Sequence, residues 1–161
     1  MLGSLARKLR AFGFDVGYFR KGTDAEIVST ARREKRVILT ADRALAASAA
    51  AAGAQALLLE GRTDGRRIAA LLARASEAGI PLRRGPPRCS ACGGELHSMT
   101  RRDAEGLVPP SVLGRHRLFR RCPACGKTYW RGGHWKKLSD LERAFGPRPR
   151  MVKGDTNGAY R

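Results

Sequence analysis

The feature that most constrains this chain is a set of four cysteines arranged as two Cys-x-x-Cys pairs. Cys89 and Cys92 form the first pair in CSACGG, Cys122 and Cys125 form the second in CPACG, and 29 residues lie between the pairs. Each pair has the spacing of a metal-binding turn, and the glycine after its second cysteine lets backbone amides face the sulfurs. Four thiolates fill the tetrahedral shell of zinc and leave no open position. We therefore expect a structural zinc site rather than a catalytic one.

Two disulfides in an exported protein are the alternative interpretation of these cysteines. The amino-terminal sequence MLGSLARKLRAFGF lacks the long apolar core and the cleavage site of a secretory signal. No segment approaches the roughly 20 apolar residues of a membrane span. We therefore favour zinc over disulfides, and we expect a soluble protein of the cytoplasm.

The chain is strongly basic: its 161 residues include 32 Lys and Arg against 14 Asp and Glu, a net charge of +18. Residues 1–85 hold 16 basic and 8 acidic residues, and residues 86–161 hold 16 basic and 6 acidic residues. A surplus of this size indicates a polyanionic partner, and we expect RNA. An acidic membrane surface and a merely solvated basic face are the alternatives. The hydrophobic content of 42% excludes wholesale disorder.

Helix and strand patterns alternate in the first half of the chain. We expect helices over residues 3–12, 23–34, 42–53 and 64–75, and strands over residues 14–19, 37–40 and 56–60. This alternation implies an α/β fold with a small parallel sheet and crossover helices. No predicted strand precedes the first helix, so we expect either a further strand ahead of it or completion of the sheet by a partner. An open sheet edge would also allow two chains to pair as a homodimer.

Prolines and glycines between residues 81 and 87 mark a domain boundary. We expect an α/β domain over residues 1–84 and a zinc ribbon over residues 85–145 that ends in a helix from about residue 136. The polar tail over residues 146–161 contains proline and glycine and is expected to be disordered.

Three carboxylates follow the predicted strands of the first half. They are Asp24, Asp42 and Asp64. Because the carboxyl ends of parallel strands meet at one edge of a sheet, we expect these side chains on the same rim. Clustered carboxylates can hold Mg²⁺ or Mn²⁺ for the hydrolysis of a phosphodiester. Each Asp also begins a predicted helix, and helix capping is the alternative, favoured for Asp24 and Asp64 more than for Asp42.

A segment rich in aromatic and basic residues follows the second cysteine pair. Its members are Tyr129, Trp130, Arg131, His134, Trp135 and Lys136. Aromatic rings stack on bases while neighbouring cations neutralise phosphates, so we expect these residues to bind RNA. The alternative is that Tyr129 and Trp130 pack the small core of the ribbon, and we expect packing for at least one of the aromatic residues.

Five blocks of the sequence resemble the Mut-seven C-terminal RNase domain family, Mut7-C. They are MLGSLARKLRAFGFD, VILTADRALA, RCSACGGEL, VPPSV and CPACGKTYWRGGHW, within residues 1–142. The resemblance implies a PIN-like nuclease domain followed by a zinc ribbon. It also implies cleavage of RNA, a hydrolase activity, through carboxylates that bind Mg²⁺ or Mn²⁺. A non-catalytic RNA-binding protein built on the ribbon is the alternative.

The resemblance further implies roles for single residues. Asp42 matches the Asp of the family's strand-Thr-x-Asp motif, Asp24 matches the acidic start of the second helix, and Asp64 is a looser match. The family normally has a strand ending in an Asp directly before the Met-Leu-Gly that opens this sequence. We therefore expect an α/β domain that is incomplete at its amino end, with weak or absent activity in the chain as given.

Overall fold

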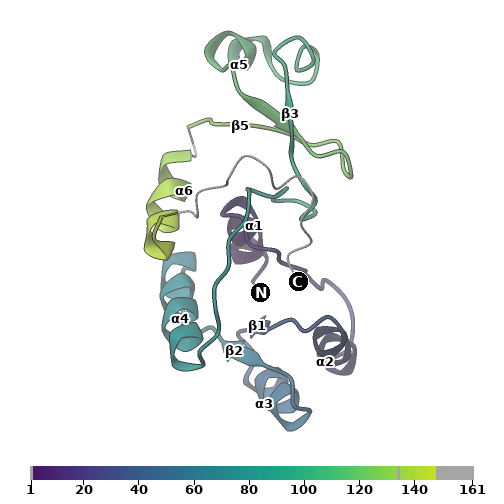
Figure 1. The fold of residues 1–161 in the computed structure, drawn as a ribbon, viewed down its shortest axis with the longest axis vertical. Helices are drawn as coiled ribbons and strands as arrows, with labels where there is room; N and C mark the ends of the chain where they lie inside the picture. The colour runs from purple at the N-terminus through teal and green to yellow at the C-terminus, as the bar shows by residue number, and fades with distance from the viewer. Residues whose placement is uncertain (1, 134, 148–161) are drawn as a thin grey trace.

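The computed structural model describes residues 2–133 and 135–147. Its helices are α1 (Gly3–Ala11), α2 (Asp24–Arg33), α3 (Arg43–Ala51), α4 (Asp64–Glu77), α5 (Pro110–Arg115) and α6 (Trp135–Glu142), followed by a 3₁₀ turn, η1 (Arg143–Phe145). Its strands are β1 (Ile38–Thr40), β2 (Ala56–Leu58), β3 (His97–Met99), β4 (Phe119–Arg121) and β5 (Thr128–Trp130). The two sheets that these strands form lie toward opposite ends of the long axis (Figure 1).

The first half of the chain builds an α/β unit around a two-stranded parallel sheet. β1 pairs with β2 in parallel, with Leu39 opposite Leu57, and α3 connects the two strands. One of the two core clusters of this unit packs α1 and α4 against the sheet. Its buried members are Leu5, Leu9, Phe12, Phe14, Leu57, Leu59, Ile68, Leu71 and Ala75. The predicted α/β fold with a small parallel sheet is therefore confirmed.

The prediction of a strand over residues 14–19 is wrong. Within the described part of the chain no strand pairs with this segment, although its sequence alternates as a strand should. Two arginine side chains bind its carbonyl oxygens instead: Arg10 Nε donates to Val16 O at 2.8 Å, and Arg36 Nη1 donates to Asp15 O at 3.3 Å. A strand requires a neighbouring backbone, and an alternating pattern alone does not supply one.

Local backbone interactions fix the start of α2 and the end of α1. The Thr23 hydroxyl accepts from the Glu26 N–H at 3.3 Å, and the Glu26 carboxylate accepts from the Thr23 N–H at 2.7 Å, which is the capping box predicted for α2. Gly13 follows α1 with φ of +97°, and a Cβ there would lie 2.1 Å from Gly85 O. Only glycine allows the segment entering the ribbon to approach the end of α1 so closely.

The second half of the chain forms an antiparallel sheet in the order β3–β4–β5. Its small core contains Ala104, Val108 and Phe119, and Met99, Val112 and Leu113 pack against it. The four cysteines lie at the end of this sheet that faces α1. This part of the chain is the expected ribbon.

The predicted last helix appears as α6 and η1, but it packs on the α/β unit. The Phe145 ring lies 5.9 Å from the Phe12 ring and 5.1 Å from the Phe14 ring, measured between centroids. Arg84 Nη1 lies 3.3 Å from the Glu142 carboxylate. The chain therefore returns to its first half after the ribbon, while the division at residue 84 stays a prediction. Of the tail predicted to be disordered, residues 148–161 lie outside the described part of the chain.

No helix in the described part of the chain combines the length and the apolar character that crossing a membrane requires.

Candidate functional site

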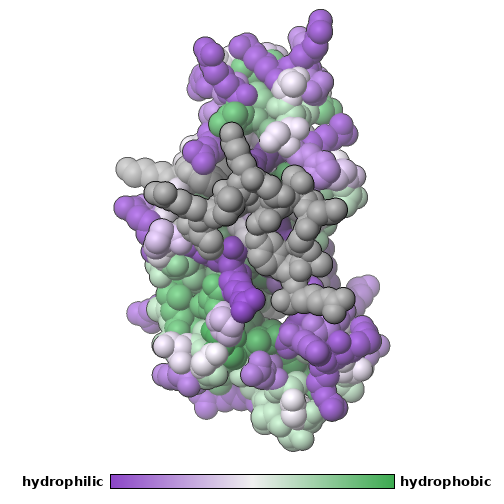
Figure 2. All heavy atoms as spheres, viewed as in Figure 1, coloured by the Kyte–Doolittle hydropathy of each residue, from purple (hydrophilic) through white to green (hydrophobic). Residues whose placement is uncertain are grey.

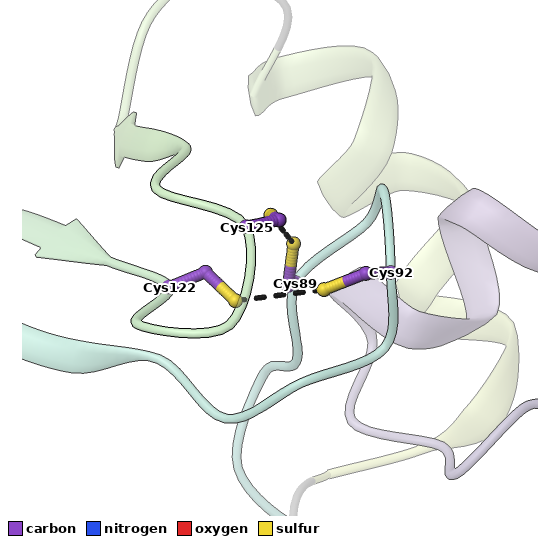
Figure 3. A group of neighbouring side chains, drawn as sticks. All are labelled: Cys89, Cys92, Cys122 and Cys125. Carbon is purple, nitrogen blue, oxygen red and sulfur yellow. Dashed lines mark hydrogen bonds between the residues drawn. The ribbon is translucent and has the colours of Figure 1, made fainter.

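The four cysteine sulfurs converge on one point between two turns of the chain (Figure 3). All four Sγ atoms lie within 4.8 Å of one another, with Cys89 and Cys125 3.5 Å apart and Cys92 and Cys122 also 3.5 Å apart. Tetrahedral zinc with Zn–S bonds of about 2.3 Å places its sulfurs about 3.8 Å apart, whereas bonded sulfurs lie about 2.05 Å apart. The spacing fits a metal shell rather than two disulfides.

The two cysteine turns share one backbone pattern. The Cys89 carbonyl accepts from the Gly93 N–H at 2.8 Å, and the Cys122 carbonyl accepts from the Gly126 N–H at 2.8 Å. Both glycines have positive φ, +86° and +73°, which closes each turn tightly. The Gly94 N–H also donates to Cys92 Sγ at 3.5 Å. These turns aim two sulfurs from each side at the same centre.

The sulfurs differ in how readily they ionise. Burial opposes ionisation of Cys89, but hydrogen bonds from the Tyr129 hydroxyl, at 3.0 Å, and from Cys92 lower the pKa of Cys89 to about 6. The Lys127 amide lowers the pKa of Cys125, but desolvation and the three neighbouring sulfurs outweigh it and raise that pKa to about 12. Four adjacent thiolates repel one another, so their full ionisation requires a cation.

Asp42 lies directly after β1 and caps α3. Its Oδ1 accepts from the Ala44 N–H at 2.8 Å and from the Leu45 N–H at 3.3 Å. No hydrogen bond or ion pair from the described residues reaches Oδ2 of this carboxylate. The capping role is therefore real for Asp42, and it leaves one oxygen for a ligand.

Asp24 and Asp64 are not the caps of their helices, so the capping interpretation is wrong for both. Threonine caps each helix instead: Thr23 accepts from the Glu26 N–H, and Thr63 accepts from the Arg66 N–H at 3.3 Å. Threonine takes this role because its hydroxyl reaches the third amide of the helix. Asp24 is the exposed first residue of α2.

Asp64 is surrounded by donors at the start of α4. The Ser4 hydroxyl donates to its Oδ2 at 2.7 Å, Lys8 Nζ forms a hydrogen-bonded ion pair with the same oxygen, and Arg67 Nη1 lies 3.7 Å from Oδ1. Burial raises the pKa of Asp64, but the bonds from Lys8 and Ser4 outweigh it, and the pKa is lowered overall. Both oxygens already face cations, so a metal ion would have to displace them.

The three predicted acids do not form one cluster. Within residues 2–133 and 135–147, the cysteines are the only group of three or more His, Cys, Asp or Glu side chains close enough together to share an ion. The catalytic role of Asp24, Asp42 and Asp64 stays a prediction.

A cavity of about 970 Å³ beside β1 is the feature that the sequence analysis did not identify. Residues 14–19 form one wall and residues 36–43 form another, and Leu2, at the start of the described chain, contributes to the lining. Asp42 also lines it. The one sequence signal related to this cavity was the expected helix over residues 3–12, which no predicted strand precedes.

The residues predicted to bind RNA have different surroundings. Tyr129 is half-buried, and its hydroxyl contacts Cys89 and Ser90, so this ring belongs to the cysteine cluster. Trp130 is 37% exposed and Arg131 is exposed. His134 lies outside the described residues, as do the side chains of Trp135 and Lys136. RNA binding by this segment stays a prediction.

The ribbon carries many exposed cations. They are Arg101, Arg102, Arg115, Arg117, Arg120, Arg121, Lys127 and Arg131. The exposed acids of the same region are Glu95, Asp103 and Glu105. The excess of positive charge gives this surface an electrostatic preference for a polyanion.

Fold and site together define a small α/β unit joined to a ribbon whose four cysteines can hold a metal ion such as zinc. Residues 1–141 match the family model described as the Mut7-C RNAse domain. The chain belongs to this family, which confirms the resemblance found in the sequence, and membership indicates a nuclease-related role with RNA as the substrate class. Comparison with curated proteins and with solved structures finds no match.

Proposed function

We propose that this protein is a metal-dependent endoribonuclease of PIN-like type, a hydrolase of phosphodiester bonds in RNA. The observation that carries this proposal is the position of Asp42, within a chain of the Mut7-C RNAse domain family. The residue follows the carboxyl end of β1, lines the cavity and keeps one carboxylate oxygen for a ligand. Ligand sites of parallel α/β sheets lie at this end of the strands.

The chemistry of the proposed donors suits a hard cation. Carboxylate oxygens are the ligands that Mg²⁺ and Mn²⁺ prefer, and Asp42 and the exposed Asp24 are the residues that would hold such an ion. When bound, the ion would activate water and neutralise charge on the scissile phosphate. Two amide hydrogen bonds fix the orientation of the Asp42 carboxylate in advance. In this proposal Asp64 supports the rim by joining α1 to α4 through Ser4 and Lys8.

The cysteine cluster serves RNA binding rather than cleavage in this proposal. Zinc in a shell of four sulfurs has no open position for a substrate, so it would stabilise the fold of the ribbon. The exposed arginines of the ribbon would contact phosphates, and Trp130 would offer a ring for stacking. His134, Trp135 and Lys136 complete the proposed RNA-binding segment.

A second candidate function is non-catalytic RNA binding through the ribbon and the basic surface. It is favoured by two observations: Asp24, Asp42 and Asp64 form no shared ion site among the described residues, and Asp64 is bonded to Lys8.

Asp42→Asn separates the two candidates. Asparagine caps a helix about as well as aspartate, so the variant keeps α3 and loses only the charge. As a nuclease, the variant cleaves structured RNA in Mn²⁺ more slowly by about 100-fold or more, with unchanged RNA affinity. As a binding protein, it behaves like the parent chain in both assays. Glu77→Gln, an exposed change on α4, is the matched control.

A further inference from the structure

We propose that the open face of the β3–β4–β5 sheet binds a short run of unpaired RNA, with Arg120 on a phosphate and Leu118 against a base. The inference rests on the RNA binding of the proposed function, and it names the form of RNA and the surface that takes it. It does not depend on cleavage. Figure 2 shows hydrophilic side chains interspersed with hydrophobic ones at the end of the molecule where Figure 1 places α5, β3 and β5.

One face of this sheet is covered by the segment that connects β3 to β4. Residues directly opposite each other across an antiparallel pair share a face, and neighbours along a strand alternate between faces. Phe119 on the central strand β4 lies opposite Met99 and is 2% exposed, because Ala104 and Val108 pack on its side. Trp130 lies opposite Phe119 on the edge strand β5 and stays 37% exposed at the margin of the covered face.

The other face is left open by the described part of the chain. Arg120 projects from it, opposite Ser98 on β3 and Tyr129 on β5. Arg120 and Ser98 are exposed, and Tyr129 is half-buried with its hydroxyl at the cysteine cluster. Extending the alternation by one residue past β4 and β5 places Leu118 and Arg131 on the same face.

This open face combines positive charge with an exposed apolar side chain. Leu118 is 76% exposed, and Arg120 and Arg131 are both exposed. No carboxylate occupies the five positions of the open face, which are Ser98, Leu118, Arg120, Tyr129 and Arg131. The arginines are complementary to a polyanion, and burial of Leu118 requires apolar surface on the same partner. A nucleic acid offers both, because each nucleotide carries a phosphate and the flat face of a base.

The exposed leucine favours unpaired RNA over a duplex. In an A-form duplex the bases are stacked, the major groove is too narrow for side chains, and domains that bind the duplex span about 16 base pairs. The open face is far smaller, because strands about 4.8 Å apart give a three-stranded sheet a width of about 10 Å between its outer strands. Only a base that has left its stack can contact Leu118 while neighbouring phosphates contact the arginines.

Arg120→Gln and Arg121→Gln form a matched pair that tests this assignment. Both residues are exposed on β4, and they project from opposite faces of the sheet. Each full chain is titrated into a labelled single-stranded RNA of about 12 nucleotides, without Mn²⁺ and at several salt concentrations. We expect Arg120→Gln to bind about fivefold more weakly and to lower the slope of log Kd against log salt by about 0.7, the value for one lost phosphate contact. Arg121→Gln should weaken binding by less than about twofold.

Leu118→Ser tests the apolar contact separately from charge. It should weaken binding by about threefold or more with an unchanged salt slope, because it removes apolar area and no cation. Leu107→Ser is its control, since Leu107 is 45% exposed in the segment that covers the opposite face. Duplex RNA of the same sequence should bind the parent chain more weakly and should not respond to Leu118→Ser. Zinc content and thermal midpoint equal to those of the parent chain show that each variant is folded.

Four results would overturn the inference. Equal effects of Arg120→Gln and Arg121→Gln would mean that charge alone governs binding, and the RNA binding of the proposed function would survive. Displacement of the RNA by polyglutamate of matched charge, as readily as by unlabelled RNA, would indicate an acidic protein partner instead. A dimer of the parent chain that Leu118→Ser dissociates would indicate a second copy on this face. Absence of any RNA binding by the parent chain would remove the RNA-binding part of the proposed function as well.

Discussion

Arg10 on α1 donates a hydrogen bond from Nη1 to the carbonyl oxygen of Ala91, at 2.8 Å, inside the first cysteine turn. The side chain is buried, with 6% exposure, and its Nε binds Val16 O. The Arg88 N–H returns a bond to the Arg10 carbonyl at 2.9 Å. One buried cation therefore joins the α/β unit to the metal-binding turn. Unfolding of either part should therefore destabilise the other.

Replacing Arg10 should destabilise the whole chain. Arg10→Met leaves the half-buried carbonyls of Val16 and Ala91 without the donors of the buried Arg10 side chain, so we expect the free energy of unfolding to fall by on the order of 2–4 kcal/mol. Arg7→Met, an exposed change on the same helix, should alter it by less than about 0.5 kcal/mol. Urea unfolding measures both values. Equal stabilities of the two variants would contradict the link.

Zinc binding should depend on each cysteine. Cys122→Ser removes one of four ligands and should leave the purified chain with far less than one zinc per molecule, because the remaining sulfurs no longer close the shell. Zinc content by atomic absorption checks this, with Ser98→Ala on β3 as the exposed control. Full retention of zinc in Cys122→Ser would rule out this shell.

Asp64 should make stability depend on acid pH. Its pKa is lowered in the folded chain, so it contributes stability above its unfolded pKa, about 3.9, and this is lost as the pH falls through the folded pKa. In Asp64→Asn the unfolding free energy should fall less steeply below about pH 4 than in the parent chain, whereas Glu77→Gln should keep the steep fall of the parent chain. Denaturant titrations between pH 2 and about pH 6 test this. Parallel curves for both variants would be the contrary outcome.

The start of α2 allows capping and ligand roles to be separated. Thr23→Ala should cost about 1 kcal/mol of stability through loss of the cap and should spare RNA cleavage. Asp24→Asn should cost only about 0.3–1 kcal/mol through the helix dipole, yet it should slow cleavage strongly. Stability and cleavage rate are measured on the same preparations. A slower Thr23→Ala and an unchanged Asp24→Asn would reverse the assignment.

Local sequence signals predicted the parts of this molecule that local chemistry determines. The spacing of Cys89, Cys92, Cys122 and Cys125 predicted one four-sulfur centre, because each turn is closed by its own glycine. The T-x-x-E sequence from Thr23 predicted the capping box, because all of its partners lie within one turn of helix.

Long-range partners explain what the sequence could not predict. Residues 14–19 have the pattern of a strand, but no strand of the described residues pairs with them, so the pattern does not become a strand. Asp64 was interpreted as a cap or a metal ligand because its partners Ser4 and Lys8 lie 60 and 56 residues away in the sequence. The Phe145 ring contacts Phe12 and Phe14, which lie near the other end of the described chain, so no local pattern predicts this contact.

The most direct test of the central claim is Mn²⁺-dependent cleavage of a structured, end-labelled RNA. The chain is assayed beside Asp42→Asn purified in the same way. The nuclease proposal predicts that cleavage requires Mn²⁺, stops with EDTA and is lost in Asp42→Asn, while RNA binding persists. Tight RNA binding without cleavage by the parent chain, or equal cleavage by Asp42→Asn, would contradict it.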